Sequence, residues 1–395
     1  MGVSRRAVVA GGLAAPFASW GARADEDPIR IGTLTPQTGS GGAYGPAMVK
    51  TAQAVAAEIN AAGGVRGRQI VLVSEDDETN PDAGVRAARK LIDVDRVCAV
   101  AGTWASAVTT AVAPLCWQAK VMLFTVSGAD SITKLPAQGY IIRTQPNTYL
   151  QMTRGGAFML SQGDKRVFVL SAQTPFAVDS YTRLAEVLKA GGGEAVGHVI
   201  YDAAKTSFRS EIDQALKTKP DAIFLNSYLP DVTILLRELY QAGFEGKRTT
   251  MGYAAGPKLL AALPPAVTEG LTTLAPSPDI DSPAYKAVQG ILGIAEPDPY
   301  SCQIYDHISL IALAVGKAGA PTGEAIHDSV RAISQGDGEK VGSAVEGLKL
   351  LAAGKEINYE GASGPCEFTP IGDIVNCKFR FEQAVGGKFQ VLSVS

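Results

Sequence analysis

Short apolar runs alternate with amphipathic stretches along most of the 395-residue chain. The first unit begins at residues 29–34, an apolar run that is followed by a glycine-rich loop. Residues 47–62 then carry apolar positions at helical spacing, and Gly63-Gly64 ends that helix. Apolar runs that predict further strands lie at residues 70–74, 97–101, 121–125, 166–170, 195–201, 222–226, 248–252 and 270–275.

Amphipathic segments separate these runs and predict helices. They lie at residues 81–94, 105–118, 151–162, 177–190, 207–217, 231–242, 257–262, 282–292, 300–316 and 323–334, and around 341–353. This regular alternation is typical of parallel sheets that helices cover on both faces. The strands are too many for one ordinary open sheet, so we expect two doubly wound parallel sheets in two lobes. Segments 366–368, 376–381 and 389–394 predict hairpins at the end of the chain.

The N-terminus has the pattern of an export signal. Ser4-Arg5-Arg6 precedes a mildly apolar segment, residues 7–20, which is too short to cross a bilayer, and Ala22-Arg23-Ala24 fits a cleavage site. The adjacent arginines indicate the twin-arginine route. We therefore expect a signal peptide over residues 1–24, cleavage after Ala24 and a mature protein in the periplasm. The alternative is a basic N-terminus of a cytosolic protein.

Charge and histidine usage narrow the classes of function. The formal net charge is −3 and no basic stripe occurs, which argues against nucleic acid as a partner. The 3 histidines are scattered, and no two cysteines have the C-x-x-C spacing of a zinc site. We therefore predict a globular protein with no metal ion.

The 5 cysteines of an exported chain predict disulfides, and an odd number leaves one thiol free. Cys98 opens a predicted strand, and Cys116 ends the predicted helix that runs back beside it, so these two can meet. Cys366 and Cys377 flank a turn signal and are predicted to pair across a hairpin. Cys302 is then the free thiol. The alternative is that all five are small buried residues without a disulfide.

The chain contains no recognisable enzyme motif. The loop at residues 39–45 resembles a dinucleotide-binding fingerprint, but Tyr44 stands where the third glycine belongs and would block a pyrophosphate. No phosphate-binding loop, nucleophile elbow or zinc-protease motif occurs. We interpret the acidic run Asp76-Asp77-Glu78 as a solvated loop in preference to a catalytic or cation site. The protein is therefore predicted not to be an enzyme and to need no cofactor.

Aromatic and small polar residues follow several of the predicted strands. Carboxyl ends of parallel strands meet at one edge of a sheet, so two facing lobes would bring these residues to a common cleft. A helix that starts at residues 105–106 offers free backbone N–H groups to a carboxylate. The alternative is that individual aromatics are ordinary core residues. The candidate ligand-binding residues are Tyr44, Trp104, Ala105, Ser106, Ser127, Gly128, Phe176, Tyr228 and Tyr253.

Several segments together resemble one known family. They are IGTLTPQTG at 31–39 with Tyr44-Gly45, the run from 58 to 81, ARKLI at 88–92, VAGTWASA at 100–107, VSGADSIT at 126–133, IIRTQP at 141–146, NSYLPDVTILLREL at 226–239, QAGF at 241–244 and Tyr305-Asp306. Over residues 28–392 the chain is similar to the type I periplasmic solute-binding proteins of ABC transporters, in the leucine/isoleucine/valine-binding family.

The resemblance implies a fold of two lobes that close on a ligand by hinge bending. The N-terminal lobe is expected to comprise residues 28–145 and 277–375, and the C-terminal lobe residues 146–276 and 376–395. Three crossovers between the lobes are then expected near residues 144–146, 275–278 and 376–379.

The resemblance also assigns ligand contacts to Tyr44, the 104–106 turn, Ser127-Gly128, Phe176 and Tyr228. In amino-acid binders of the family, the ligand carboxylate meets the turn that corresponds to Ala105-Ser106. An acidic residue in the segment corresponding to 249–257 pairs with the α-ammonium, but this segment has no acid here. Asp130 is the one candidate substitute. Phe176 stands where many members have tyrosine.

The expected function is that of a monomeric substrate-binding component of an ABC importer. It would capture a branched-chain or other apolar amino acid, or a related carboxylate, and deliver it to a permease and ATPase complex in the inner membrane. One alternative is a binder of amine-free aromatic or aliphatic acids. Another is a ligand sensor for a membrane receptor.

Overall fold

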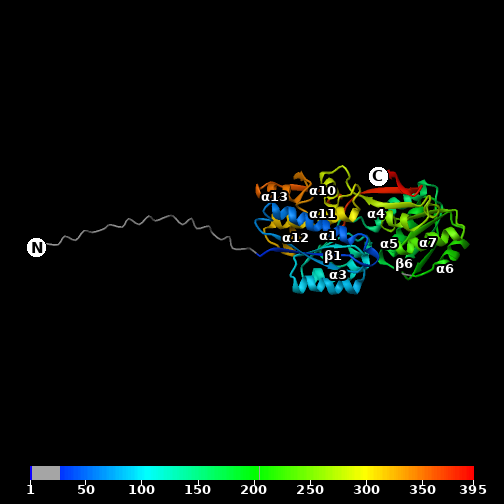
Figure 1. Cartoon of the computed structure of the whole chain (residues 1–395), viewed down its shortest axis with the longest axis horizontal. Coiled ribbons are helices and arrows are strands. Elements are labelled where there is room, and N and C mark those ends of the chain that lie inside the picture. The colour runs from blue at the N-terminus through cyan, green and yellow to red at the C-terminus, as the bar shows by residue number, and fades with distance from the viewer. Residues whose placement is uncertain (2–26, 204) are drawn as a thin grey trace.

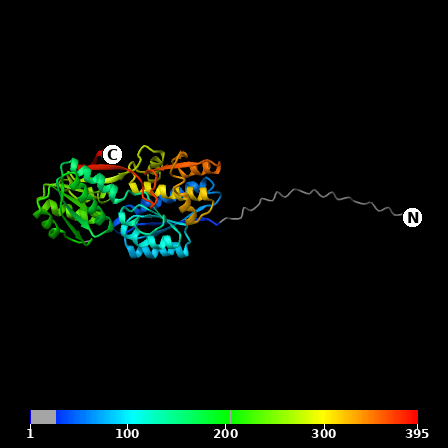
Figure 2. The same cartoon turned by 180° about the vertical axis from the view of Figure 1, so that it is seen from behind.

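The computed structural model describes Met1 and residues 27–203 and 205–395. Apart from Met1, the predicted signal peptide and its cleavage site after Ala24 lie outside the described residues. Figure 1 shows two globular bodies side by side along the long axis, and Figure 2 shows the same arrangement from behind. In the described ranges, no helix is both long and apolar enough to span a membrane.

The first lobe is built on a five-stranded parallel sheet with strand order β2-β1-β3-β4-β5. Its strands are β1 Ile29–Thr35, β2 Ile70–Asp76, β3 Ala99–Thr103, β4 Met122–Thr125 and β5 Ile141–Arg143. Its helices are α1 Gly45–Ala61, α2 Pro81–Arg89, α3 Ser106–Gln118, α10 Pro283–Leu292, α11 Pro299–Ala318, α12 Gly323–Ser329 and α13 Ala344–Ala352. A small sheet joins β11 Glu339–Val341, β12 Ile357–Gly361 and β13 Gly364–Pro365.

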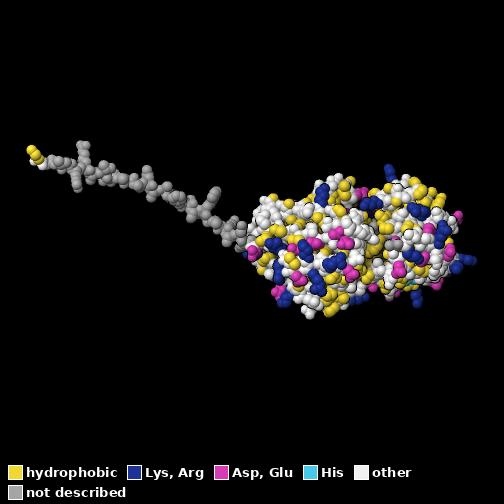
Figure 3. Space-filling view, turned by 60° about the horizontal axis from the view of Figure 1, so that its bottom comes forward, with side chains coloured by type: hydrophobic (Ala, Val, Ile, Leu, Met, Phe, Trp, Pro, Cys, Tyr) yellow, Lys and Arg dark blue, Asp and Glu magenta, His cyan; other side chains and the backbone are white. Residues whose placement is uncertain are grey.

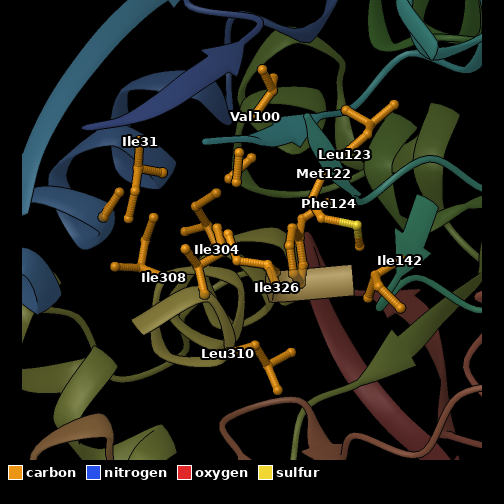
Figure 4. Close-up of a cluster of buried hydrophobic side chains, with 14 of the residues drawn as sticks. Ile31, Val100, Met122, Leu123, Phe124, Ile142, Ile304, Ile308, Leu310 and Ile326 are labelled. Carbon is orange, nitrogen blue, oxygen red and sulfur yellow. The ribbon is translucent and has the colours of Figure 1, made fainter. Parts of the chain in front are cut away.

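Helix α11 forms the centre of the first lobe. Every residue from Tyr300 to Gly316 in this helix is buried, which is the pattern of a helix enclosed on all sides. Figure 4 shows Ile304 and Ile308 among the side chains of the sheet, with Ile31 and Phe124 nearby. The core of this lobe therefore joins strands from the start of the chain to a much later helix. About 155 residues, on the order of the length of one domain, separate the end of β5 from the start of α11.

The second lobe is built on a seven-stranded sheet with strand order β15-β14-β10-β9-β8-β6-β7. Its strands are β6 Arg166–Ala172, β7 Glu194–Tyr201, β8 Ala222–Asn226, β9 Lys247–Met251, β10 Thr272–Ser277, β14 Lys378–Val385 and β15 Lys388–Val394. Its helices are α4 Thr148–Ser161, α5 Pro175–Ala190, α6 Arg209–Lys217, α7 Leu229–Gln241, α8 Pro257–Ala262 and α9 Pro265–Thr268. The terminal hairpin β14–β15 joins β10 in antiparallel orientation, so this sheet is mixed where a parallel sheet was predicted.

The chain passes between the lobes three times, namely after β5, after β10 and before β14. This confirms the predicted two-lobed α/β architecture. Strand β5 was not predicted, because three residues are too few to show a period of apolar positions.

A buried ion pair joins the first and third crossovers. Arg143, which is fully buried, donates from Nε to Asp373 Oδ1 at 2.9 Å, and its Nη2 also reaches that oxygen. The guanidinium further donates to Thr133 Oγ1 at 2.9 Å and to the carbonyl of Ala129. Asn147, which caps α4 in the second lobe, donates to Asp373 Oδ2 at 3.2 Å. The carboxylate therefore contacts groups at the boundary of both lobes.

All five cysteines are free thiols, so both predicted disulfides are wrong for this structure. The turn between Cys366 and Cys377 does form, with Phe368 bridged to Ile374. Continuing that register places Cys366 opposite residue 376, and successive side chains of a strand point to opposite faces. Cys366 accordingly packs in the first lobe's core, whereas Cys377 packs against a core cluster of the second lobe.

The thiol of Cys98 is turned toward β1 and away from a disulfide with Cys116. Its Sγ donates to the carbonyl of Arg30 at 3.3 Å. Burial raises the pKa of the Cys98 and Cys116 thiols to about 12. Both thiols therefore stay protonated at neutral pH, and they behave as small apolar side chains of the core. Cys302, predicted to be free, is also fully buried.

Charged side chains of both signs are interspersed on the face shown in Figure 3, with apolar side chains scattered between them. No single-sign field covers this face. This mixture of signs agrees with the modest net charge of the chain.

Candidate ligand-binding site

A cavity lies between the lobes, at the carboxyl ends of the strands. Seven of the nine predicted ligand-binding residues line it, and they come from both lobes. The lining residues are Trp104, Ala105, Ser106, Val126, Gly128, Gln145, Ala172, Thr174, Phe176, Asn226, Ser227, Tyr228, Tyr253 and Tyr300.

The N-terminus of α3 forms one wall of the cavity. Trp104 and Ala105 connect the end of β3 to this helix, which begins at Ser106 and runs for 13 residues. Ala105 is its N-cap and has no side-chain oxygen to accept from the first turn. The first-turn N–H groups and the positive end of the helix dipole therefore remain available to an anion.

Aromatic rings form much of the remaining wall. The Trp104 ring lies between rings from the two lobes, with centroids 5.4 Å from Tyr228, 5.7 Å from Tyr253 and 5.8 Å from Tyr300. Phe176 meets Tyr253 edge-on at 5.9 Å. Such tilted and edge-to-face contacts are the favoured geometry of aromatic pairs, so the rings stabilise the approach of the lobes and present flat apolar surface to a ligand.

Polar contacts also join the lobes across the cleft, which is closed. The hydroxyl of Tyr44 donates to the carbonyl of Tyr253 at 2.9 Å. Near the cavity, Asp179 of α5 accepts from the backbone N–H of Ser131 at 3.0 Å and from its hydroxyl at 3.1 Å. These contacts can form only when the two lobes are close, so they contribute to the closed state.

Among the residues that the structure describes, no lysine, arginine, aspartate, glutamate or histidine lines the cavity. Burial, together with the nearby carboxylates of Asp77 and Asp231, raises the pKa of Tyr228 to about 12. Burial also raises the pKa of Tyr253 and Tyr300 well above the ordinary value for tyrosine. All three phenols therefore stay neutral, and the cavity offers aromatic surface and hydrogen bonds without a formal charge.

Two predicted residues do not line the cavity, and their contacts show why. Ser127 is fully buried and donates from its hydroxyl to the carbonyls of Thr103 and Trp104, at 3.1 and 2.9 Å. It therefore holds the turn that carries the α3 N-terminus. Tyr44 packs behind Trp104, with ring centroids 5.7 Å apart, and lines a neighbouring cavity.

The acidic residues nearest the site lie outside the lining of the cavity. Asp130 accepts from the backbone N–H of Tyr149 at 3.1 Å and does not line the cavity. Asp77 is fully buried, which corrects its interpretation as part of a solvated loop, and burial raises its pKa to about 7. In the described part of the chain, no cluster of His, Cys, Asp and Glu is arranged to hold a metal ion.

Several lining residues were not among the predicted site residues. Asn226 ends β8 and Ser227 directly follows it, and their position at the end of a strand was the available signal. Tyr300 comes at the start of α11, where Asp298 caps the helix by accepting from the N–H groups of Tyr300 and Ser301, both at 3.0 Å. No strand leads into it, so the rule of strand ends could not find it. The remaining additions are Val126, Gln145, Ala172 and Thr174.

Known proteins with a similar sequence or fold cover nearly the whole chain. A chemotactic signal transduction system substrate-binding protein of Halobacterium salinarum is 27% identical over 355 residues, which are 87% of this chain and 84% of that protein. A leucine-binding protein from Thermotoga maritima has a TM-score of 0.79 at 21% identity, over 93% of this chain and 98% of its own. An ABC transporter solute-binding protein from R. palustris, in complex with benzoate, has a TM-score of 0.76 at 19% identity, over 93% of this chain and 96% of its own.

The sequence model of one family spans both lobes and the site between them. It matches residues 28–388, which include every residue that lines the cavity. The chain therefore belongs to the periplasmic binding protein family.

Proposed function

We propose that this protein is the substrate-binding component of an ABC importer for small aromatic carboxylates that lack an amine. The observation that carries the proposal is the cavity itself, which joins an uncapped helix N-terminus to aromatic rings and contains no charged side chain. The helix N-terminus suits a carboxylate, and the rings suit a flat apolar body.

The absence of an acid from the cavity lining argues against an amino acid as the ligand. An α-ammonium group buried there would lose its hydration without gaining a carboxylate partner, which costs several kcal/mol. The hydroxyls of Ser106, Tyr228 and Tyr300 offer only neutral hydrogen bonds in its place. A ligand with a carboxylate and no ammonium group does not have this cost, because the free N–H groups at the N-terminus of α3 can donate to the carboxylate.

The comparisons are compatible with either ligand class. The similar protein from R. palustris holds benzoate, and the similar protein from T. maritima is a leucine-binding protein. Both share the fold with this chain at low identity, so the choice between the ligand classes rests on the residues of the cavity.

The proposal includes the biological setting of the protein. A signal peptide over residues 1–24 would direct export, and the mature protein would act in the periplasm as a monomer. Its lobes, residues 28–145 with 277–375 and residues 146–276 with 376–395, would close on the ligand and present it to the permease and ATPase complex. Binding and release involve no covalent step, so the protein would not be an enzyme.

Isothermal titration of the mature protein with benzoate, phenylalanine and leucine tests the ligand class. The protein is first unfolded and refolded to remove any ligand that co-purifies. We expect benzoate to bind with a Kd about a hundredfold lower than that of phenylalanine. This ratio corresponds to a loss of about 2.7 kcal/mol of binding free energy when an ammonium group is buried without a carboxylate partner. Equal or tighter binding of either amino acid would overturn the amine-free class.

Tyr44→Phe is expected to weaken the binding of benzoate about fivefold. The substitution keeps the ring but removes the hydroxyl that donates across the cleft to Tyr253, and one neutral hydrogen bond contributes about 1 kcal/mol. The same titration measures it. Tyr240→Phe, at an exposed tyrosine of α7, is the control and should leave the Kd unchanged. A Kd for Tyr44→Phe equal to that of the original protein would mean that closure does not depend on this contact.

A ligand sensor is the second candidate function, and the similarity to a chemotactic substrate-binding protein favours it. A strain in which the gene for this protein is deleted distinguishes the importer from the sensor. Loss of benzoate uptake, measured with labelled benzoate, supports the importer, whereas intact uptake with lost movement toward benzoate supports the sensor.

A further inference from the structure

One side chain of the cavity has a polar atom without a partner. Asn226 ends β8 in the second lobe and is 1% exposed. The Tyr253 hydroxyl makes a long hydrogen bond of 3.4 Å to its Oδ1. Its Nδ2 is buried and has no hydrogen-bond partner. Among the described residues that line the cavity, no other buried side chain leaves an oxygen or nitrogen unpaired in this way.

A buried N–H group without an acceptor is costly, and such groups in folded proteins are nearly always paired. The first-lobe wall offers the N-terminus of α3 for a carboxylate, and Asn226 lies on the second-lobe wall with Thr174 and Ser227. A ligand that fills the cavity from one lobe to the other therefore brings its far end to Asn226.

We propose that Asn226 is a specificity-determining residue whose Nδ2 donates to an acceptor oxygen on the ligand ring, at the end remote from the carboxylate. This inference rests on the proposed function and narrows its substrate class. The ligand is an aromatic carboxylate that bears an oxygen substituent, such as a methoxy, hydroxyl or carbonyl group, and not the unsubstituted ring.

The substituent also has a role in closure. A carboxylate bound at α3 contacts the first lobe through hydrogen bonds, whereas an oxygen bound at Asn226 contacts the second. A ligand with both groups hydrogen-bonds to both lobes at once, and it stabilises the closed form relative to an open one. Benzoate has only the first group and gains less from closure.

Titration calorimetry with benzoate, 3-methoxybenzoate and 4-methoxybenzoate tests the inference on the mature protein. A methoxy oxygen can accept a hydrogen bond but cannot donate one. It can therefore pair with the Nδ2 donor of Asn226 but not with its Oδ1 acceptor. We expect one of the two methoxybenzoates to bind about tenfold more tightly than benzoate, the effect of one additional hydrogen bond. In Asn226→Leu, which has a similar size and no donor, the methoxybenzoate that the original protein prefers should bind no more tightly than benzoate.

Far-UV circular dichroism shows whether Asn226→Leu is folded. A second measurement needs no variant, since the side-chain amide resonances of Asn226 in ¹⁵N-labelled protein should shift much further with the preferred methoxybenzoate than with benzoate. Equal affinities for all three acids, or an equal loss for all three in the variant, overturn the role of Asn226 but leave the proposed function standing. Failure of every acid to bind the original protein overturns the proposed function itself.

Discussion

Replacing Arg143 by methionine lowers the free energy of unfolding by about 3–5 kcal/mol, the cost of leaving a buried charge without its partner. The guanidinium is fully buried and donates to Asp373, Thr133 and the carbonyl of Ala129. Methionine fills similar space but leaves the largely buried carboxylate of Asp373 without its charged partner. Urea unfolding followed by far-UV circular dichroism measures the loss.

An exposed ion pair provides the matched control. Lys355 and Glu339 are 3.0 Å apart, and both side chains are more than half exposed. Lys355→Met should therefore change the unfolding free energy by less than about 1 kcal/mol. The double variant Arg143→Met with Asp373→Leu should be more stable than Arg143→Met alone, because the stranded charge is gone. A change below about 1 kcal/mol for Arg143→Met would show that this pair does not stabilise the crossovers.

Gly128→Ala weakens ligand binding about tenfold to a hundredfold. A Cβ at this position would lie 2.6 Å from Cε2 of Phe176 and 2.8 Å from Nε2 of Gln151, both of which belong to the second lobe. Overpacking of this kind costs about 1–3 kcal/mol, and the clash can be relieved by keeping the lobes apart. Calorimetry with benzoate measures the affinity, and small-angle scattering with ligand present measures the opening.

The clash lies between lobes, so the stability of each lobe should change little. Gly290→Ala is the control, because a Cβ there meets nothing within 4 Å and the residue lies in helix α10. Its affinity should match that of the original protein. Tight binding by Gly128→Ala would mean that the closed form accommodates the methyl group by moving the Phe176 ring.

The architecture could be predicted because the apolar periods of strands and helices are local signals. Strands such as β8 match their predicted bounds, since a buried parallel strand is a continuous apolar run. The pairing of cysteines could not be predicted in this way. The wrong disulfide between Cys366 and Cys377 came from a correctly placed turn whose register differs by one residue, and register depends on contacts that no local pattern contains.

The site could be predicted as far as the topology carries residues to the ends of strands. Trp104, Phe176 and Tyr228 follow strands and do line the cavity. Tyr300 arrives from the start of a helix after the chain has crossed back from the second lobe, and the open amide of Asn226 depends on what its neighbours leave unpaired. The position of Tyr300 and the unpaired amide of Asn226 both depend on tertiary contacts, which local sequence patterns do not predict.

The late position of α11 in the chain has a consequence for synthesis. Strands β1, β3 and β4 leave the ribosome early, but the helix that covers them ends at Ala318, which at ordinary rates of translation follows roughly 10 to 35 s after β5. The second lobe, by contrast, is contiguous from α4 to β10 and lacks only the edge strands β14 and β15. The sheet that is made first therefore stays without its covering helix while the central strands and helices of the second lobe are made. A chaperone that shields a nascent apolar sheet would find its target in the N-terminal third.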